Sequence, residues 1–168
     1  MSRERDAVDR IIEQWGEVRA DLDVYPMGVI GRISRLEKHV AQRLAANFAN
    51  HGLERWTFDV LATLYRSGEP HELTAGDLVG HSMVTTGAIT NRIDRLEERG
   101  LVERARTDDR RKVLVRLTSA GKRLVDETLE THLATERELL APLSPRQQEQ
   151  LAGLLRTMLV HLGDRAES

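Results

Sequence analysis

The sequence contains no cysteine and few aromatic residues, and these shortages exclude several classes of protein. Without cysteine there are no disulfides, no thiol catalysis or thiol redox sensing, and no Cys-ligated zinc site. Aromatic residues make up 4% of the chain, which favours a helical core of Leu, Ile, Val and Ala. No apolar run approaches the roughly 20 residues of a membrane helix, and the charged start, MSRERDAVDR, lacks an apolar signal region. We therefore expect a cytoplasmic protein with no membrane partner.

The motifs of common enzymes and metal sites are also missing. The sequence has no Ser/His/Asp arrangement, no phosphate-binding Gly-rich loop and no H-E-x-x-H motif. Its six histidines are scattered, with no pair at the helical spacing of metal ligands. We expect neither enzymatic activity nor a cofactor nor a metal site.

Apolar spacing in this chain of 168 residues predicts a single, mainly α-helical domain. Strict alternation before Thr118, preceded by a charged tract, predicts a small β-hairpin over 102–117. Thr57 and Thr74 are candidate N-caps, and Ser144-Pro145-Arg146-Gln147 reads as a capping box with proline at the first helical position. Tyr25-Pro26 is expected to interrupt the helical pattern. The expected helices cover about 8–22, 30–50, 57–67, 75–79, 84–99, 118–140 and 145–162.

The terminal helical regions, 1–50 and 118–168, carry wide apolar stripes with no other element to cover them. Burial against a second copy of the chain covers these stripes, so we expect a homodimer with these regions as its dimerisation part. An intramolecular bundle of the same helices is the alternative. The middle of the chain, 53–117, is expected to be continuous with them in one domain.

Residues 74–100 read as helix, short turn and helix, an arrangement that presents its second helix to the DNA major groove. At 100° per residue, Ile89, Ile93 and Leu96 fall together and face the core. The opposite side of the N-terminal half is small and hydrogen-bonding, which suits contacts to phosphates and base edges. A solvated polar face on an ordinary helix would show the same pattern.

Charge is concentrated in the same part of the chain. The segment from Met83 to Arg116 contains nine basic and six acidic residues, a local charge of +3, which leaves −5 on the remaining chain. Such segregation is the footprint of a phosphate-contacting surface, although a charge run is also common in solvated loops. We expect double-stranded DNA with a pseudo-palindromic operator as partner. The candidate DNA contacts are Thr85, Thr86, Gly87, Thr90, Asn91, Arg95, Arg106, Arg110, Arg111 and Lys112.

The string TTGAITNRIDRLEERGLVERARTDDRRKVLVRLTSAG, from Thr85 to Gly121, resembles the winged helix-turn-helix signature of MarR-type transcriptional regulators. The similarity extends from about Met27 to Leu162, although the segment between Arg104 and Asp109 is one residue shorter than the commonest form. The resemblance implies a mainly α winged helix-turn-helix fold with a small β-hairpin wing and long N- and C-terminal dimerisation helices. It also implies sequence-specific DNA binding, with repression as the family default.

A narrower resemblance is to the urate-responsive, PecS-like branch of that family. This branch has a Trp on an added N-terminal helix, an Asp early in the helix after the dimer arm, and two arginines, one in the recognition helix and one at the start of the wing. The resemblance implies that a small anion such as urate or a related purine binds there and releases the operator. The matching ligand-binding positions are Trp15, Asp59, Arg92 and Arg104.

The chemistry of these four residue types agrees with that role. Trp15 offers a flat wall for a planar ring, and arginine offers a planar fork for an anionic heterocycle. An arriving anion would repel Asp59, which could then change partners, for example to Arg104. Arg92 lies about 60° from the core direction of its helix, toward neighbouring helices rather than DNA.

Other interpretations remain open at this point. Each of the four residues also has an ordinary explanation, as core filler, first-turn charge, salt bridge or phosphate contact. The effector could be another small organic anion, such as a phenolic acid or a tricarboxylate. A helical interaction module with no DNA role would be a different class of protein, and a steep salt dependence of binding to duplex DNA would separate the two.

Overall fold

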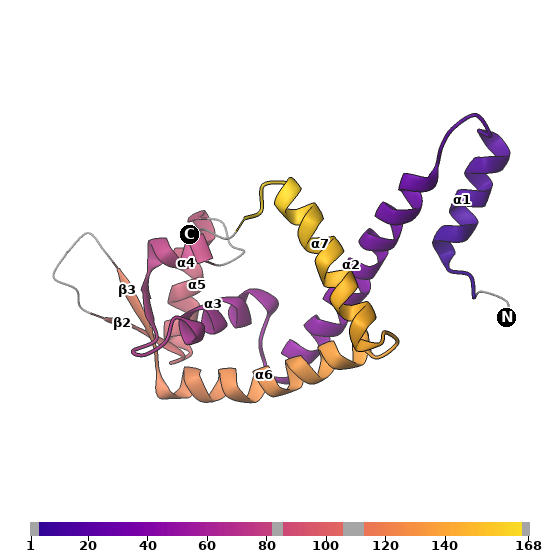
Figure 1. The fold of residues 1–168 in the computed structure, drawn as a ribbon. Helices are drawn as coiled ribbons and strands as arrows, with labels where there is room; N and C mark the ends of the chain where they lie inside the picture. The colour runs from indigo at the N-terminus through magenta and orange to yellow at the C-terminus, as the bar shows by residue number, and fades with distance from the viewer. Residues whose placement is uncertain (1–3, 82–85, 106–112, 166–168) are drawn as a thin grey trace. The chain divides into compact units, whose positions relative to one another are not determined.

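A computed structural model describes residues 4–81, 86–105 and 113–165 (Figure 1). The chain forms two compact units, residues 1–46 and 47–168, which are described separately below. The fold is mainly α-helical with one small antiparallel sheet, as the sequence predicts.

The first unit contains α1 (Ala7–Val18) and most of α2 (Tyr25–Asn50). Asp6 caps α1, and its side chain accepts hydrogen bonds from the backbone N–H groups of Val8 and Asp9. α1 ends four residues earlier than the apolar spacing predicts, because the backbone leaves the helical conformation at Arg19, with φ −137° and ψ 63°. The expected interruption at Tyr25-Pro26 is the first turn of α2, where proline lacks only an N–H that the helix does not use.

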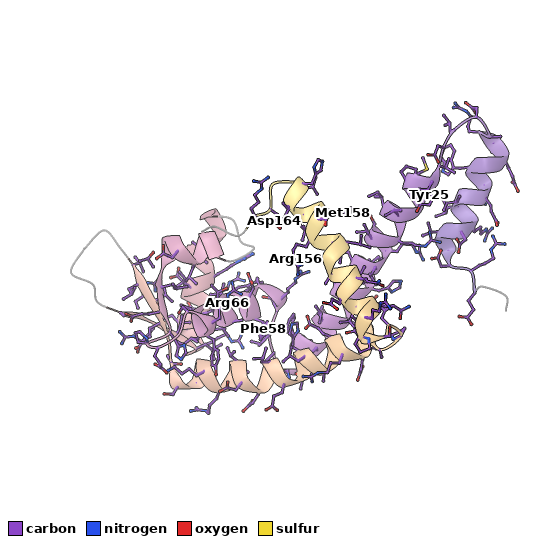
Figure 2. All side chains as sticks on the ribbon, in the orientation of Figure 1. Tyr25, Phe58, Arg66, Arg156, Met158 and Asp164 are labelled. Carbon is purple, nitrogen blue, oxygen red and sulfur yellow. The ribbon has the colours of Figure 1, made fainter. Side chains whose placement is uncertain are left out.

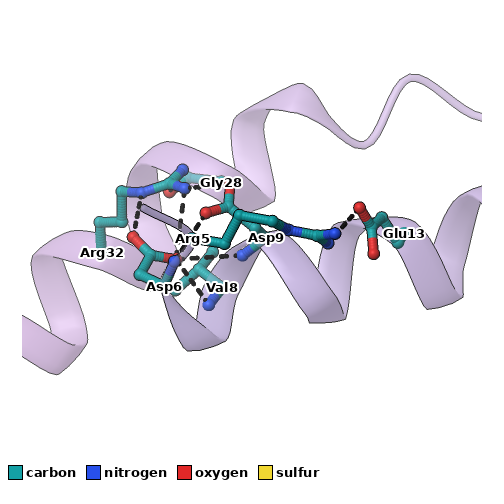
Figure 3. Close-up of polar contacts among 7 residues, drawn as sticks. All are labelled: Arg5, Asp6, Val8, Asp9, Glu13, Gly28 and Arg32. Carbon is teal, nitrogen blue, oxygen red and sulfur yellow. Dashed lines mark hydrogen bonds and ion pairs between the residues drawn. The ribbon is translucent and has the colours of Figure 1, made fainter. Parts of the chain in front are cut away.

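α1 is fastened to α2 by one arginine and by close packing. The Arg32 guanidinium donates to Asp6 Oδ2 at 2.7 Å and to Asp9 Oδ1 at 2.6 Å (Figure 3). Gly31 allows the buried side chain of Val8 to approach α2, since a Cβ on Gly31 would lie 3.3 Å from Val8 Cγ1. The ion pairs of Arg32 and the packing of Val8 against Gly31 therefore both hold α1 against α2.

The second unit contains the remaining elements, in an order that the sequence predicts except for one strand. Its core is made of aliphatic side chains contributed by its helices and its sheet; the most deeply buried are Val60, Leu61, Leu64, Leu78, Ile93, Leu96, Val102, Val115 and Val125. The elements are α3 (Arg55–Arg66), β1 (Glu72–Thr74), α4 (Ala75–His81), α5 (Thr86–Glu98), β2 (Val102–Ala105), β3 (Leu114–Leu117), α6 (Ser119–Leu140) and α7 (Pro145–His161).

The sheet has the order β1-β3-β2, with both pairs antiparallel. β2 and β3 form the predicted hairpin, with Glu103 opposite Arg116. β1 is the strand that the sequence does not predict, and it places Glu72 opposite Arg116 on the other side of β3. A three-residue strand shows too little alternation to be recognised, and its partner lies about forty residues later.

Two predicted helix starts in this unit are confirmed and one is wrong. Thr74 Oγ1 accepts from the Asp77 N–H at 3.1 Å, and Ser144 with Gln147 forms the capping box ahead of α7. Thr57 is not an N-cap: α3 starts two residues earlier, after Glu54, and Thr57 is fully buried inside the helix. Thr57 is therefore a buried residue of the helix and not its cap.

Several helices leave large apolar side chains on their surface. On and after α7 these are Leu154, Leu155, Met158, Leu159, Val160 and Leu162, and on α2 they include Tyr25, Met27, Val29, Ile30 and Leu36. Figure 2 labels Met158 and Tyr25 among these side chains. Among the residues that the structure describes, no helix is both long and apolar enough to cross a membrane. The apolar stripes predicted from the sequence thus leave large side chains exposed on α2 and α7.

Candidate DNA-binding surface and effector site

α4 and α5 form the predicted helix-turn-helix, and the two faces of α5 differ sharply. Ile89, Ile93 and Leu96 are buried, as their 100° spacing predicts. Thr90, Asn91 and Arg95 are exposed. The buried face fixes the position of α5 on the core and leaves the polar face available for a ligand outside the unit.

The other predicted DNA contacts divide into two groups. Thr86 and Gly87 lie in the first turn of α5. Thr85 and the basic residues of the hairpin tip, Arg106, Arg110, Arg111 and Lys112, lie outside the described residues. Arg116, a basic residue at the hairpin base, forms an ion pair with Glu72 at 2.6 Å and thus links two strands of the sheet.

Arg104, at the start of the hairpin, is tied to α5. One terminal nitrogen contacts Asp94 and the other contacts Glu97, while the Arg104 N–H donates to Glu97 Oε1 at 3.3 Å. The hydrogen bond to Asp94, helped by the charges of both carboxylates, raises the pKa of the Arg104 guanidinium above its usual value. Ion pairs therefore connect the start of the wing to α5.

Arg92 makes a different kind of contact. Its guanidinium carbon lies 5.2 Å from the centroid of the Trp56 ring on α3, within the range of a cation–π interaction. The Trp56 indole N–H donates to Glu54 Oε2 at 2.5 Å, which fixes the direction of the ring. Sequence reasoning missed Trp56 because the expected helix began at Thr57; the remaining signal was an aromatic residue one helical turn before Asp59.

The remaining two predicted ligand-binding residues lie in different units. Asp59 is half-buried on α3, and its carbonyl accepts from Thr63 Oγ1 at 2.7 Å. Trp15 lies on α1 in the first unit, where it is 41% exposed. Together with Ile11, Gln14 and Val18 it lines a hollow of about 260 Å³. Asp59, Arg92 and Arg104 thus share the second unit, and a pocket that joins them to Trp15 stays a prediction.

Comparison with known proteins identifies the family. Residues 51–112 match the model of the MarR family. The chain is 37% identical to the HTH-type transcriptional regulator PecS of Dickeya dadantii (strain 3937) over 92% of this chain and 94% of that protein. The chain belongs to the MarR family. Its similarity to PecS agrees with the PecS-like resemblance of its sequence.

Solved MarR structures share its fold. AbsC from Streptomyces coelicolor superposes with a TM-score of 0.77 at 21% identity, over 86% of this chain and 98% of that one. Another MarR family regulator from the same organism, solved in complex with DNA, has a TM-score of 0.74 at 21% identity, over 82% of this chain and 87% of that one.

As a MarR regulator, this protein binds DNA and controls transcription, and it is not an enzyme. Membership accounts for the exposed polar face of α5 and for the sheet that follows it. Within the described residues, no group of three or more His, Asp or Glu side chains is arranged to hold a metal ion.

Proposed function

We propose that this MarR regulator is a homodimer that represses transcription and releases its operator when urate or a related purine anion binds. Trp15, Asp59, Arg92 and Arg104 are the proposed ligand-binding residues. The observation that carries the proposal is the attachment of both arginines to the recognition helix. Arg92 is part of α5, and Arg104 is bonded to Asp94 and Glu97 on α5.

That attachment supplies a route from the ligand to the DNA. An anion that binds the Arg92 guanidinium also repels the Asp59 carboxylate on α3. A new partner for Asp59, such as Arg104, would compete with the two α5 carboxylates that hold Arg104 now. The same anion would then shift α5 and the start of the wing together, and so disfavour the placement that suits the groove.

For the DNA complex we propose that α5 enters the major groove. Thr90 and Asn91 would read base edges with Thr86 and Gly87, while Arg95 and Thr85 contact phosphates. The hairpin residues Arg106, Arg110, Arg111 and Lys112 would contact phosphates and the minor groove. Two such helices about one DNA turn apart require a pseudo-palindromic site.

The exposed apolar side chains of α7 and α2 support the homodimer. A row that includes Leu154, Leu155 and Leu159 is costly to leave in water, and a second copy would bury it. Sedimentation of the wild-type protein should give a dimer at micromolar concentration. Leu159→Asp should shift it toward monomer and weaken operator binding, whereas a monomeric wild type with specific DNA binding would contradict the proposal.

The experiment that tests the ligand is a DNA-release titration with urate. Coupling of about 1–3 kcal/mol would weaken operator binding about 5- to 150-fold, and DNA must weaken urate binding by the same factor. Arg92→Ala should reduce urate affinity more than DNA affinity, since the side chain faces α3. Asp59→Asn should bind DNA but respond less, and Trp15→Phe should bind urate less well because its ring is smaller.

A second effector class is another organic anion, because a guanidinium binds phenolates and carboxylates as well as purines. The same titration with a phenolic acid and a tricarboxylate separates the classes. Wild-type protein that keeps its operator at saturating urate would remove the purine from the proposal. Wild-type responses in all three variants would remove the four-residue pocket.

A further inference from the structure

The contact between Trp56 and Arg92 joins two helices of the second unit by an unusual interaction. Arg92 comes from the recognition helix α5, and Trp56 comes from the first turn of α3. The guanidinium carbon lies 5.2 Å from the ring centroid, and tryptophan is the aromatic side chain that attracts cations most strongly. Both side chains are half-buried, so water screens the contact only in part.

The two arginines of the proposed site are held in opposite ways. The positive charge of Arg104 is balanced by contacts to two carboxylates. Within the part of the chain that the structure describes, Arg92 forms no ion pair, and the Trp56 ring is the contact recorded for its guanidinium. A cation on a π face keeps its full charge, and its N–H groups keep their donor capacity for a ligand.

We propose that Trp56 is a positioning residue of the effector site, which holds Arg92 over α3 with its hydrogen-bond donors free for a planar anion. This inference rests on the proposed function and adds a fifth residue to it. A carboxylate partner would hold the arginine equally well, but an arriving anion would have to displace that carboxylate. An aromatic partner fixes the guanidinium without competing for its N–H groups.

The orientation of the ring is itself fixed. Glu54, the residue before α3, accepts the indole N–H at 2.5 Å. That bond uses the only polar atom of the indole, and Arg92 lies over the face of the ring. These two contacts thus link Glu54, at the start of α3, through Trp56 to Arg92 on the recognition helix.

The test compares direct urate affinity, measured by calorimetry without DNA, across variants of this contact. Removal of this half-buried cation–π contact should weaken binding about 2- to 5-fold, so we expect that loss in Trp56→Leu and a smaller one in Trp56→Phe, which keeps a π face. In the Arg92→Ala background, Trp56→Leu should cause no further loss, because Trp56 acts through Arg92. Tyr65→Leu, which removes an aromatic side chain from the far end of α3, should bind urate like wild type.

Fluorescence provides a readout that a merely structural role would not change. The chain has two tryptophans, so Trp15→Phe leaves Trp56 as the only tryptophan, and excitation at about 295 nm selects its emission from that of tyrosine. In that background, urate should alter the Trp56 emission, and Arg92→Ala should alter it before any ligand is added. If Trp56→Leu fails to fold, the smaller loss in Trp56→Phe and this emission change still decide the question.

Three outcomes would overturn the inference. Wild-type affinity in Trp56→Leu removes the positioning role and leaves the proposed function intact. Full additivity of the Trp56→Leu and Arg92→Ala losses shows that Trp56 does not act through Arg92. A wild-type protein that binds no purine overturns the proposed function, and the role of Trp56 with it.

Discussion

Arg116 on the central strand β3 faces Glu72 on β1 in register, and the two side chains form an ion pair of 2.6 Å. Glu103 lies opposite Arg116 on the other neighbour, β2, at 3.8 Å. One arginine thus joins three strands across the same face of the sheet. β1 has three residues and few backbone hydrogen bonds, so a cross-strand side-chain pair adds to its stability.

We therefore expect Arg116→Ala to destabilise the second unit. Arg116 is 40% exposed, so the loss should be modest, about 0.5–1 kcal/mol, and smaller at high salt. Thermal unfolding at low and high salt measures it. Arg123→Ala is the matched control, since Arg123 is exposed and forms no ion pair in the described part of the chain. Equal losses in both variants would contradict the role of the strand pair.

Gly121 is a position where a methyl group has no room. A Cβ there would lie 2.2 Å from the Leu101 carbonyl oxygen, which accepts the Thr118 N–H. Gly121→Ala should destabilise the unit by about 1–3 kcal/mol, measured by chemical unfolding. Gly153→Ala on α7, where nothing lies within 4 Å of the new Cβ, should cause no loss. A tolerated Gly121→Ala would show that α6 packs differently from the structure.

The packing of α1 on α2 should depend on pH. The hydrogen bond from Arg32 holds the pKa of Asp6 below its usual value, so the carboxylate stabilises the folded form. A lowered folded pKa means that this stability is present above the unfolded pKa of about 3.9 and is lost as the pH falls through the folded pKa. Protection of the α1 amides from hydrogen exchange, relative to their intrinsic rates at each pH, should therefore fall below about pH 4. Asp6→Asn should exchange faster at neutral pH and show no such acid transition.

Base reading and phosphate binding should separate between two residues of the proposed DNA surface. Asn91→Ala should reduce discrimination between operator and random DNA, because its exposed side chain lies on the polar face of α5. Arg111→Ala should weaken both complexes and make the salt dependence shallower by about one charge. Binding titrations at several salt concentrations measure both effects. An equal loss of discrimination in the two variants would contradict this division.

The sequence predicts the helices and the hairpin well because each has a local signal. Ile89, Ile93 and Leu96 repeat at helical spacing, and all three are buried. Thr57 misled because threonine suits both an N-cap and a buried helix position, and only the packing of α3 distinguishes them. Strand β1 could not be predicted, since its existence depends on a partner far along the chain.

The candidate site shows the same division. Arg92 and Arg104 carry a recognisable local context, and both lie on or against α5. Their partners, Trp56 and Asp94, have no signal that links them to the arginines, because those contacts depend on how α3, α5 and β2 pack. Local spacing can identify a charged group, but its neighbours are set by tertiary structure.

The base of the hairpin and the first helix of the helix-turn-helix share a backbone bond. β1 runs directly into α4, and the Ala75 N–H donates to the Val113 carbonyl at 2.9 Å, just ahead of β3. The start of α4 and the residue just ahead of β3 are thus hydrogen-bonded to one another in the free protein. No entropy is lost on bringing these two points together when DNA binds, so more of the contact energy appears as affinity.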